Sequence, residues 1–377
     1  MSDSQNAPKW GNPPWVIDFL PTPLPIPQEV DFAVVGGGFT GLATAAWLRH
    51  LDAQKSVALF ESRSIGSGAS GHTGGMTLAE TAAGDLPGLG NVLGGFSDTL
   101  TQLGVDGDLS LPGAWEVARK GALPRSPIAW SDSGALRATK QVPGGTIDPG
   151  KLVSGLARAA EGLGAQIFED AAVENLEWEH PLRLIVRGQI VRAHRVLLAT
   201  NAMSLELNDL STRAQPKLTL AIATEPLQSA QLAKLGLASG MPFYTVDFPY
   251  LWGRVLRSGG VVFGSGLVHV DSWRELAGLD VAAGESAALI TRLEARVRGL
   301  HPVLNGVQFT HRWGGPILIP DEWRPVFEQH PRSPHALVLG GYSGHGVALS
   351  VYLGRWAAEV LCGRGSLPDW KSSKETA

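Results

Sequence analysis

The sequence DFAVVGGGFTGLATAAWLRHL, residues 31–51, decides the fold of this chain. Its first five residues predict a short buried strand, and LATAAWLRHL predicts a helix with apolar residues on one face. Between them, Gly36, Gly38 and Gly41 satisfy the pattern G-x-G-x-x-G. The first glycine allows a tight turn, the second lets a pyrophosphate approach the backbone, and the third lets helix and strand pack closely.

The second half of this unit ends at Glu61, 20 residues after Gly41. The run SVALFE at 56–61 predicts a second parallel strand that is buried on both sides. A carboxylate at its end accepts hydrogen bonds from ribose hydroxyls and would repel a 2′-phosphate. We therefore expect a β-α-β dinucleotide-binding unit, with the pyrophosphate at the start of a helix from Leu42. This unit alone does not distinguish FAD from NAD.

Composition argues against several classes of protein. The chain has 377 residues, of which 44% are hydrophobic and 18% charged, enough for two domains or one large α/β body. Its net charge is −4 and its basic residues are scattered, so no nucleic-acid partner is expected. The single cysteine, Cys362, excludes an internal disulfide and a CxxC redox pair. We find no secretory signal and no apolar run of about 18 residues, and expect a cytoplasmic protein without a membrane span.

The first 29 residues carry seven prolines and form a distinct segment. Proline removes backbone donors and favours extended paths. We expect an arm that lies over the surface and is anchored by Trp10, Trp15 and Phe19. An arm that binds a partner protein is the alternative.

Further motifs follow the glycine turn in a fixed order. They are GSGASGHTGG at 66–75, IDPGKLVSGLARAAEGLGAQIFEDAAVENLE at 147–177, ATNA at 199–202, WGG at 313–315 and GYSGHGVAL at 341–349. With them, the chain resembles the D-amino acid oxidase-like family of FAD-dependent amine oxidases over roughly residues 30–365. That family includes glycine, sarcosine and γ-glutamylputrescine oxidases and the dimethylglycine dehydrogenases. The resemblance implies FAD as the cofactor and a small amine as the substrate.

The resemblance and the periodicity together predict an α/β fold. We expect a Rossmann-like FAD-binding domain built from discontinuous segments, and a mostly antiparallel β-sheet substrate domain. The expected segments are the arm at 1–29, FAD-binding parts at 30–110, 147–215 and 326–377, and substrate-domain parts at 111–146 and 216–325. The segment 326–377 includes a C-terminal tail.

The loop at 66–75 has so few side chains that its backbone can run flat beside an isoalloxazine ring. The GYSGHG segment opens a long helix, whose N–H groups and dipole can stabilise negative charge on a reduced flavin. No metal site is expected. The residues expected to contact FAD are Gly36, Gly38, Phe39, Thr40, Gly41, Glu61, Ser62, Arg63, Gly68, Ala69, Ser70, His72, Thr73, Gly74, Gly75, Met76, Val173, Ala199, Thr200, Asn201, Gly315, Gly341, Tyr342, Ser343, Gly344, His345, Gly346, Val347 and Ala348.

His72 lies eleven residues after Glu61. In the dimethylglycine and sarcosine dehydrogenase branch of the family, a histidine of this loop bonds covalently to the 8α-methyl group of the flavin. The γ-glutamylputrescine oxidase branch carries arginine in the comparable loop. The resemblance therefore implies a covalent link through His72, and a histidine that only hydrogen-bonds the cofactor is the alternative.

Members of the family that act on α-amino acids hold the carboxylate with an arginine four residues after the tryptophan of WxGLRPxTxD. Here the stretch reads WGGPILIPDEWRP, and Ile317 occupies the arginine position. We therefore expect an amine without an adjacent carboxylate, unless Arg254, Arg257 or Arg324 supplies a substitute clamp.

Hydride transfer from a neutral amine to flavin needs orientation more than acid–base groups. The candidate catalytic residues are Trp313, Tyr244, Tyr250 and Arg254, with Trp252 as a further aromatic wall and His345 as a group that tunes the flavin. We expect either oxygen or another electron acceptor, and the sequence leaves the oligomeric state open. The alternatives are a dehydrogenase with a protein or quinone acceptor and a non-catalytic flavin subunit. The sequence lacks the motifs of a flavin hydroxylase and those of a disulfide reductase.

Overall fold

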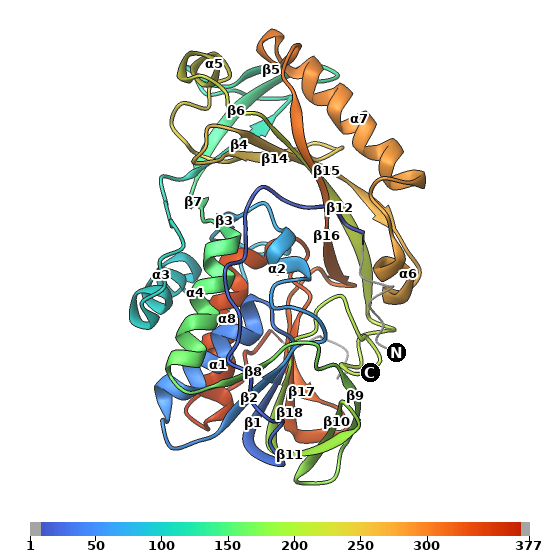
Figure 1. The fold of residues 1–377 in the computed structure, drawn as a ribbon. Coiled ribbons are helices and arrows are strands. Elements are labelled where there is room, and N and C mark those ends of the chain that lie inside the picture. Colours follow the sequence, from blue (N-terminus) through green and yellow to red (C-terminus); the bar gives the residue numbers. More distant parts are fainter. Residues whose placement is uncertain (1–8, 371–377) are drawn as a thin grey trace, which may run out of the picture.

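The computed structural model describes residues 9–370 and contains two large β-sheets, one in each half of the molecule (Figure 1). The lower half in Figure 1 holds the glycine-rich turn and most of the helices, and the upper half holds the second sheet with α7 along its outer side. The expected α/β fold with a second, mostly antiparallel sheet is confirmed.

The first sheet has a parallel centre. Its main order is β17-β18-β11-β1-β2-β8, and all of these neighbours are parallel except β17 and β18. A hairpin of β9 and β10 extends it by pairing antiparallel with the first half of β11. The strands are β1 (Glu29–Val35), β2 (Val57–Phe60), β8 (Gln166–Phe168), β9 (Val173–Glu177), β10 (Leu182–Val186), β11 (Gln189–Leu198), β17 (Val326–His330) and β18 (Ser333–Gly340).

Helices pack on one face of this sheet through a single apolar cluster. Local chemistry fixes their starts: Asp148 caps α4 by accepting a hydrogen bond from the Lys151 N–H at 2.9 Å, and Pro149 stands in its first turn. The helices of this half are α1 (Phe39–Leu51), α2 (Ala69–His72), α3 (Val92–Leu103), α4 (Pro149–Gly162) and α8 (Gly346–Leu361).

Helix α1 begins three residues earlier than the sequence indicated. It starts at Phe39 with Gly38 as its N-cap, so the prediction of a helix from Leu42 was wrong. The reason is that Gly41 belongs to the first helical turn, where its missing side chain lets the turn lie against Gly36. The free N–H groups of the helix therefore lie inside the glycine motif itself.

The second sheet has the order β16-β12-β15-β14-β13-β4-β6-β5 and is antiparallel except for the β13–β4 pair. A small sheet of β3 and β7 lies outside it. The remaining elements are β3 (Met76–Leu78), β4 (Ala114–Ala118), β5 (Ala129–Ser131), β6 (Ala135–Val142), β7 (Gly144–Thr146), β12 (Ala214–Thr224), α5 (Ser229–Lys234), β13 (Phe243–Thr245), β14 (Trp252–Val255), β15 (Val261–His269), α6 (Trp273–Gly278), α7 (Gly284–Leu300), the 3₁₀ turn η1 (Pro302–Leu304) and β16 (Phe309–Pro320).

The described part of the N-terminal arm lies over the rest of the molecule as an exposed or half-buried segment, anchored by the buried Trp10 and the half-buried Trp15 and Phe19. Trp10 is 1% exposed, and its indole N–H donates a hydrogen bond to the Leu276 carbonyl at 3.0 Å. Its own carbonyl accepts from the Gly314 N–H at 2.7 Å. In Figure 1 the dark-blue arm runs from β1 in the lower half up to the second sheet. The arm therefore connects the two halves.

No helix within residues 9–370 is both long and apolar enough to cross a bilayer.

Candidate functional site

A cavity of about 750 Å³ opens where the carboxyl ends of β1, β2 and β11 meet the second sheet. Ligands of open parallel sheets bind at this edge, where the strand order reverses. Its walls come from the glycine turn, the loop at 67–76, the start of α8, strands β12, β15 and β16, and the segment at 244–252. The cavity therefore brings together all the segments from which the sequence predicted a cofactor site.

The glycine turn forms a wall with no space for side chains. A Cβ atom on Gly36, whose φ is +110°, would lie 2.6 Å from the Ala199 carbonyl oxygen. A Cβ atom on Gly41 would lie 1.9 Å from the carbonyl oxygen of Gly36. By contrast, a Cβ atom on Gly68 would meet nothing within 4 Å, because that residue borders open space. The cradle therefore presents backbone N–H groups, the arrangement that binds a pyrophosphate.

Glu61 closes one end of the cradle. Its Oε2 accepts a hydrogen bond from the Gly37 N–H at 2.7 Å, and its Oε1 accepts from the Arg63 N–H at 3.0 Å. Among the residues that the structure describes, Glu61 is the only carboxylate that lines the cavity and Arg63 is the only guanidinium. The carboxylate is thus held in place at the end of β2, where ribose hydroxyls can donate to it.

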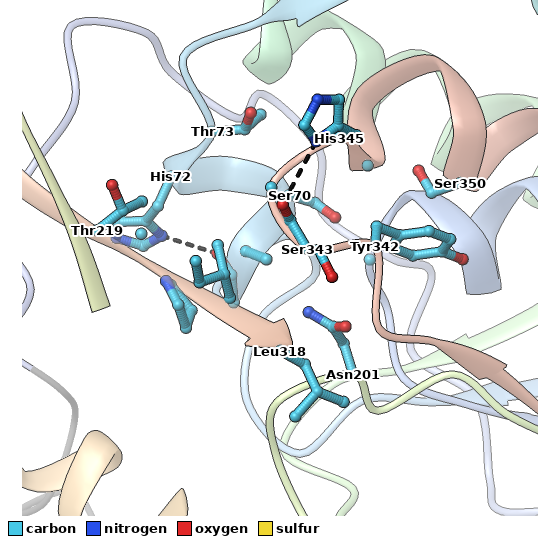
Figure 2. Close-up of a pocket in the computed structure, with 18 of the residues that line it drawn as sticks. Ser70, His72, Thr73, Asn201, Thr219, Leu318, Tyr342, Ser343, His345 and Ser350 are labelled. Carbon is cyan, nitrogen blue, oxygen red and sulfur yellow. Dashed lines mark hydrogen bonds between the residues drawn. The ribbon is translucent and has the colours of Figure 1, made fainter. Parts of the chain in front are cut away.

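The start of α8 forms the opposite end. The Ser343 hydroxyl is buried, lines the cavity and has no hydrogen-bond partner among the described residues. Figure 2 shows Ser343 and His345 together at this turn, with Tyr342 behind them. The Tyr342 hydroxyl pairs with the Thr40 hydroxyl at 2.7 Å, which ties α8 to α1. An unsatisfied buried hydroxyl at a helix start is a group that a bound ligand can satisfy, so these residues fit a flavin.

Trp10 and Trp313 both contact His72. Its Nδ1 lies 2.9 Å from the Gly68 carbonyl oxygen, and the Trp10 ring packs edge-on at 5.7 Å between centroids. The Trp313 indole N–H donates to the His72 carbonyl at 3.0 Å. Burial lowers the pKa of His72, and hydrogen bonds to the backbone of Gly68 and Gly11 oppose that effect only in part. The ring is therefore favoured in its neutral form and fixed in orientation.

Aromatic side chains line the rest of the cavity. Trp313 is completely buried, and Tyr244 donates a hydrogen bond to Glu80 at 3.3 Å. Burial raises the pKa of Tyr244, so the phenol is not a base near neutral pH. Tyr250 is half exposed and packs against Phe248 with 4.1 Å between ring centroids. These walls are apolar with a few hydroxyls.

Arg254 does not line the cavity. Its guanidinium is buried against Gly75, packs over the Trp15 ring at 5.8 Å, and has an Nε without a hydrogen-bond partner among the described residues. Burial lowers its pKa to about 10, and the charge of Asp148 only partly offsets this. Arg254 is therefore a buried cation behind the 67–76 loop, out of contact with the cavity.

The structure brings the predicted cofactor residues together with few exceptions. Gly41, Gly75, Gly341 and Ala348 stand outside the lining, where they support the backbone, and the other predicted cofactor residues line the cavity. Sequence reasoning missed lining residues on the second sheet, because an alternating strand carries no local signal for a site. They include Thr219, Ala221, Leu267 and His269, together with Phe248.

Comparison with known proteins agrees with this geometry. The model of the family described as DAO, FAD dependent oxidoreductase, matches residues 31–132 and 114–360. The γ-glutamylputrescine oxidoreductase of Escherichia coli is 26% identical over 377 residues, which cover 88% of this chain and 84% of that protein. A probable oxidoreductase, OrdL, of Haemophilus influenzae is 29% identical over 225 residues, 58% of this chain and 48% of that protein.

Solved structures share the fold at low sequence identity. Glycine oxidase from Geobacillus kaustophilus has a TM-score of 0.70 at 18% identity, covering 90% of this chain and 96% of its own. L-proline dehydrogenase from P. horikoshii has a TM-score of 0.71 at 16% identity, covering 90% and 95%.

Proposed function

The chain belongs to the FAD-dependent oxidoreductase family and is an enzyme of the amine and amino-acid oxidase type. On this premise we propose that it oxidises a C–N bond of a small amine and does not bind an α-carboxylate at the position of Ile317. The observation that carries the proposal is the side chain of Ile317, which lines the cavity where a carboxylate clamp would otherwise stand.

The other candidate clamps are engaged elsewhere. Arg257 forms an ion pair with Asp108 at 2.6 Å and is largely exposed. Arg324 pairs with Glu322 and donates to the Trp370 carbonyl. Arg254 is buried behind Gly75. None of the three arginines therefore supports recognition of an α-carboxylate.

The residues around the cavity support a defined way of holding FAD. The N–H groups at the start of α1 suit the pyrophosphate, Glu61 suits the ribose, and Ser343 with the start of α8 suits the pyrimidine edge of the flavin. When bound, FAD supplies a two-electron acceptor that takes a hydride from the carbon next to the amine nitrogen.

The chain's own residues bind and orient the amine. Trp313, Tyr244 and Trp252 restrict it to a narrow apolar space, which favours the neutral amine and excludes bulk water. Loss of hydride from the α-carbon to the acceptor and of a proton from nitrogen to water leaves an imine, which water hydrolyses to a carbonyl compound and either ammonia or a smaller amine. No protein base is required if the amine enters unprotonated.

Anaerobic mixing of the FAD-loaded enzyme with a panel of primary, N-methyl and amino-acid amines tests the proposal. We expect one class to bleach the flavin absorption, and oxygen admitted afterwards to restore it. Bleaching without rapid restoration would indicate a dehydrogenase that uses a protein or quinone acceptor. If no amine bleaches the flavin, the chain is a non-catalytic flavin subunit and the proposal is wrong.

We further propose that His72 is bonded covalently to the flavin. The bond would replace a C–H bond of the 8α-methyl group, whose proton is lost, and would leave the flavin reduced by two electrons until its electron acceptor reoxidises it. The fixed, neutral imidazole of His72 at the cavity wall supports this, because an unprotonated ring nitrogen is the nucleophile such a bond requires. Acid precipitation of the enzyme tests it, with a yellow pellet expected for the natural chain and a colourless pellet for His72→Ala. A colourless pellet from the natural chain would exclude the bond.

Three further statements stay predictions from the sequence. These are the division into six segments, oxygen as the electron acceptor, and a cytoplasmic location, which the single cysteine supports.

A further inference from the structure

We propose that Lys217 and His269 form an anion subsite at the cavity, which binds a carboxylate or similar anionic group carried by the amine substrate. This inference rests on the proposed function, because it assigns a second recognition point to the same substrate. The anionic group bound by this subsite is remote from the reacting carbon. Ile317, by contrast, occupies the position of an arginine that would bind a carboxylate on the reacting carbon.

Lys217 is a buried cation without a counter-ion. It lies on β12, is 9% exposed, and its Nζ is 2.7 Å from Nδ1 of His269. Among residues 9–370, no carboxylate oxygen lies within 4.0 Å of this ammonium group. Buried charges are normally paired, because desolvation without a partner is unfavourable. Lys217 does not itself line the cavity, so an anion there would contact His269, which does, with the charge of Lys217 behind it.

The hydrogen bond between the two side chains determines which ring nitrogen of His269 accepts a hydrogen bond and which one donates. An ammonium group has donors and no acceptor, so Nδ1 of His269 accepts from Lys217. The neutral ring then carries its proton on Nε2, which makes that nitrogen a donor. His269 is exposed and lines the cavity, so the pair presents an N–H group backed by a positive charge.

Strand register puts this pair beside the missing arginine. Lys217 on β12 lies directly opposite Ile317 on one side and His269 on the other. Because side chains opposite each other in a sheet share a face, all three belong to one row. Thr219 belongs to the next row of the same face and adds a hydroxyl to the lining. The positive charge absent from β16 is therefore present one strand away.

The charges around the cavity favour an anion over a cation. Within residues 9–370, the only carboxylate in the lining is Glu61, at the end of β2 on the first sheet, where it is held by the backbone of Gly37 and Arg63. No lining carboxylate can therefore bind the remote ammonium group of a polyamine on the second sheet. The substrate class that fits is an amine with a carboxylate on the far end of a short chain.

Direct binding gives the first test, independent of turnover. Butanoate is titrated calorimetrically into the FAD-loaded enzyme and into Lys217→Met, with Lys234→Met on the exposed surface of α5 as the matched control. A charge-assisted hydrogen bond predicts that Lys217→Met weakens butanoate binding about 10- to 100-fold, while Lys234→Met does not change it. Equal affinity in all three proteins would overturn the proposal.

Substrate choice gives the second test. Flavin reduction is measured anaerobically with 4-(methylamino)butanoate and with N-methylbutylamine, and the ratio of the two values of kcat/KM is compared between proteins. The ratio should fall about 10- to 100-fold in Lys217→Met and be largely retained in Lys217→Arg. An unchanged ratio in Lys217→Met would overturn the proposal. So would an equal loss with both amines, because it would mean that the pair acts on the flavin.

Two controls separate the possible causes of failure. His269→Leu, at an exposed position, should lower the same ratio with little effect on folding. If no amine of the whole panel reduces the flavin in the natural chain, the proposed function fails, and the butanoate titration still decides whether the anion subsite exists.

Discussion

Gly41 is the residue on which the start of α1 depends most directly. A Cβ atom at this position would lie 1.9 Å from the carbonyl oxygen of Gly36, and backbone cannot move aside as a flexible side chain can. The glycine therefore sets both the packing of the helix on β1 and the shape of the cradle.

We expect Gly41→Val to lower the free energy of unfolding by about 3 kcal/mol or more and to abolish FAD retention. Gly162→Ala is the matched control, because a Cβ atom at the last residue of α4 meets nothing within 4 Å. It should stabilise the protein by about 0.5–1 kcal/mol. Denaturant unfolding and flavin content after gel filtration check both, and a Gly41→Val protein that keeps its flavin would contradict this account.

Single residues also mark the limit of what the sequence could reveal. The glycine motif and Glu61 were predictable, because turn chemistry and spacing act over short stretches of chain. Lys217 and His269 lie 52 residues apart and meet only through strand pairing. Their chemistry depends on register, which single-sequence patterns do not supply.

At the scale of elements, the N-terminal arm shows how far composition alone can describe a segment. Its prolines indicated an extended path correctly, but they contain no information on what that path packs against. The arm adds Trp10 and Trp15 to the back of the site, where the Trp15 indole N–H donates to the Gly71 carbonyl at 2.6 Å. It also reaches α4, where Asp18 N–H donates to the Ser154 hydroxyl at 2.8 Å.

Loss of the arm's buried anchor should weaken both stability and cofactor retention. Trp10→Ala is expected to lower the free energy of unfolding by about 3–5 kcal/mol and to speed FAD release, because the large side chain leaves a cavity beside His72. Val16→Ala, in the same arm but at a position 79% exposed, should stay within about 0.5 kcal/mol of the natural chain. If the two substitutions changed the free energy of unfolding and the rate of FAD release equally, Trp10 would not be the anchor of the arm.

At the scale of the whole molecule, buried histidines make the fold sensitive to mild acid. Burial lowers the pKa values of His72, His330 and His345 below the ordinary value of 6.5. As the pH falls through about 6.5, the unfolded chain takes up protons that the folded protein does not. The free energy of unfolding therefore decreases through this range and levels off below the folded pKa values.

We expect the thermal midpoint to fall between pH 7.5 and 5.5, before the carboxylates titrate. His330→Asn should flatten this dependence, since the His330 ring is buried against Trp178 and its Nε2 has no partner among the described residues. Val16→Ala, an exposed substitution that removes no titratable group, should leave the slope as it is. A midpoint that does not change with pH in the natural chain would refute the explanation.

The two-sheet architecture was predictable in outline, because the β-α-β pattern and the alternating strands have different periods. What the sequence could not indicate was how the sheets face each other. That depends on contacts such as Trp313 with His72, which lie 241 residues apart. Most of the cofactor half of the cavity follows local motifs, whereas the substrate half is assembled from distant strands.

The position of Trp10 also has a consequence for biosynthesis. The hydrogen-bond partner of this tryptophan, Leu276, is made 266 residues after it. At roughly 5–20 residues per second, that interval is on the order of tens of seconds. The contacts of the arm with Arg63, Gly71 and His72 can therefore form early, whereas its link to the second sheet forms only after Leu276 and Gly314 have been made.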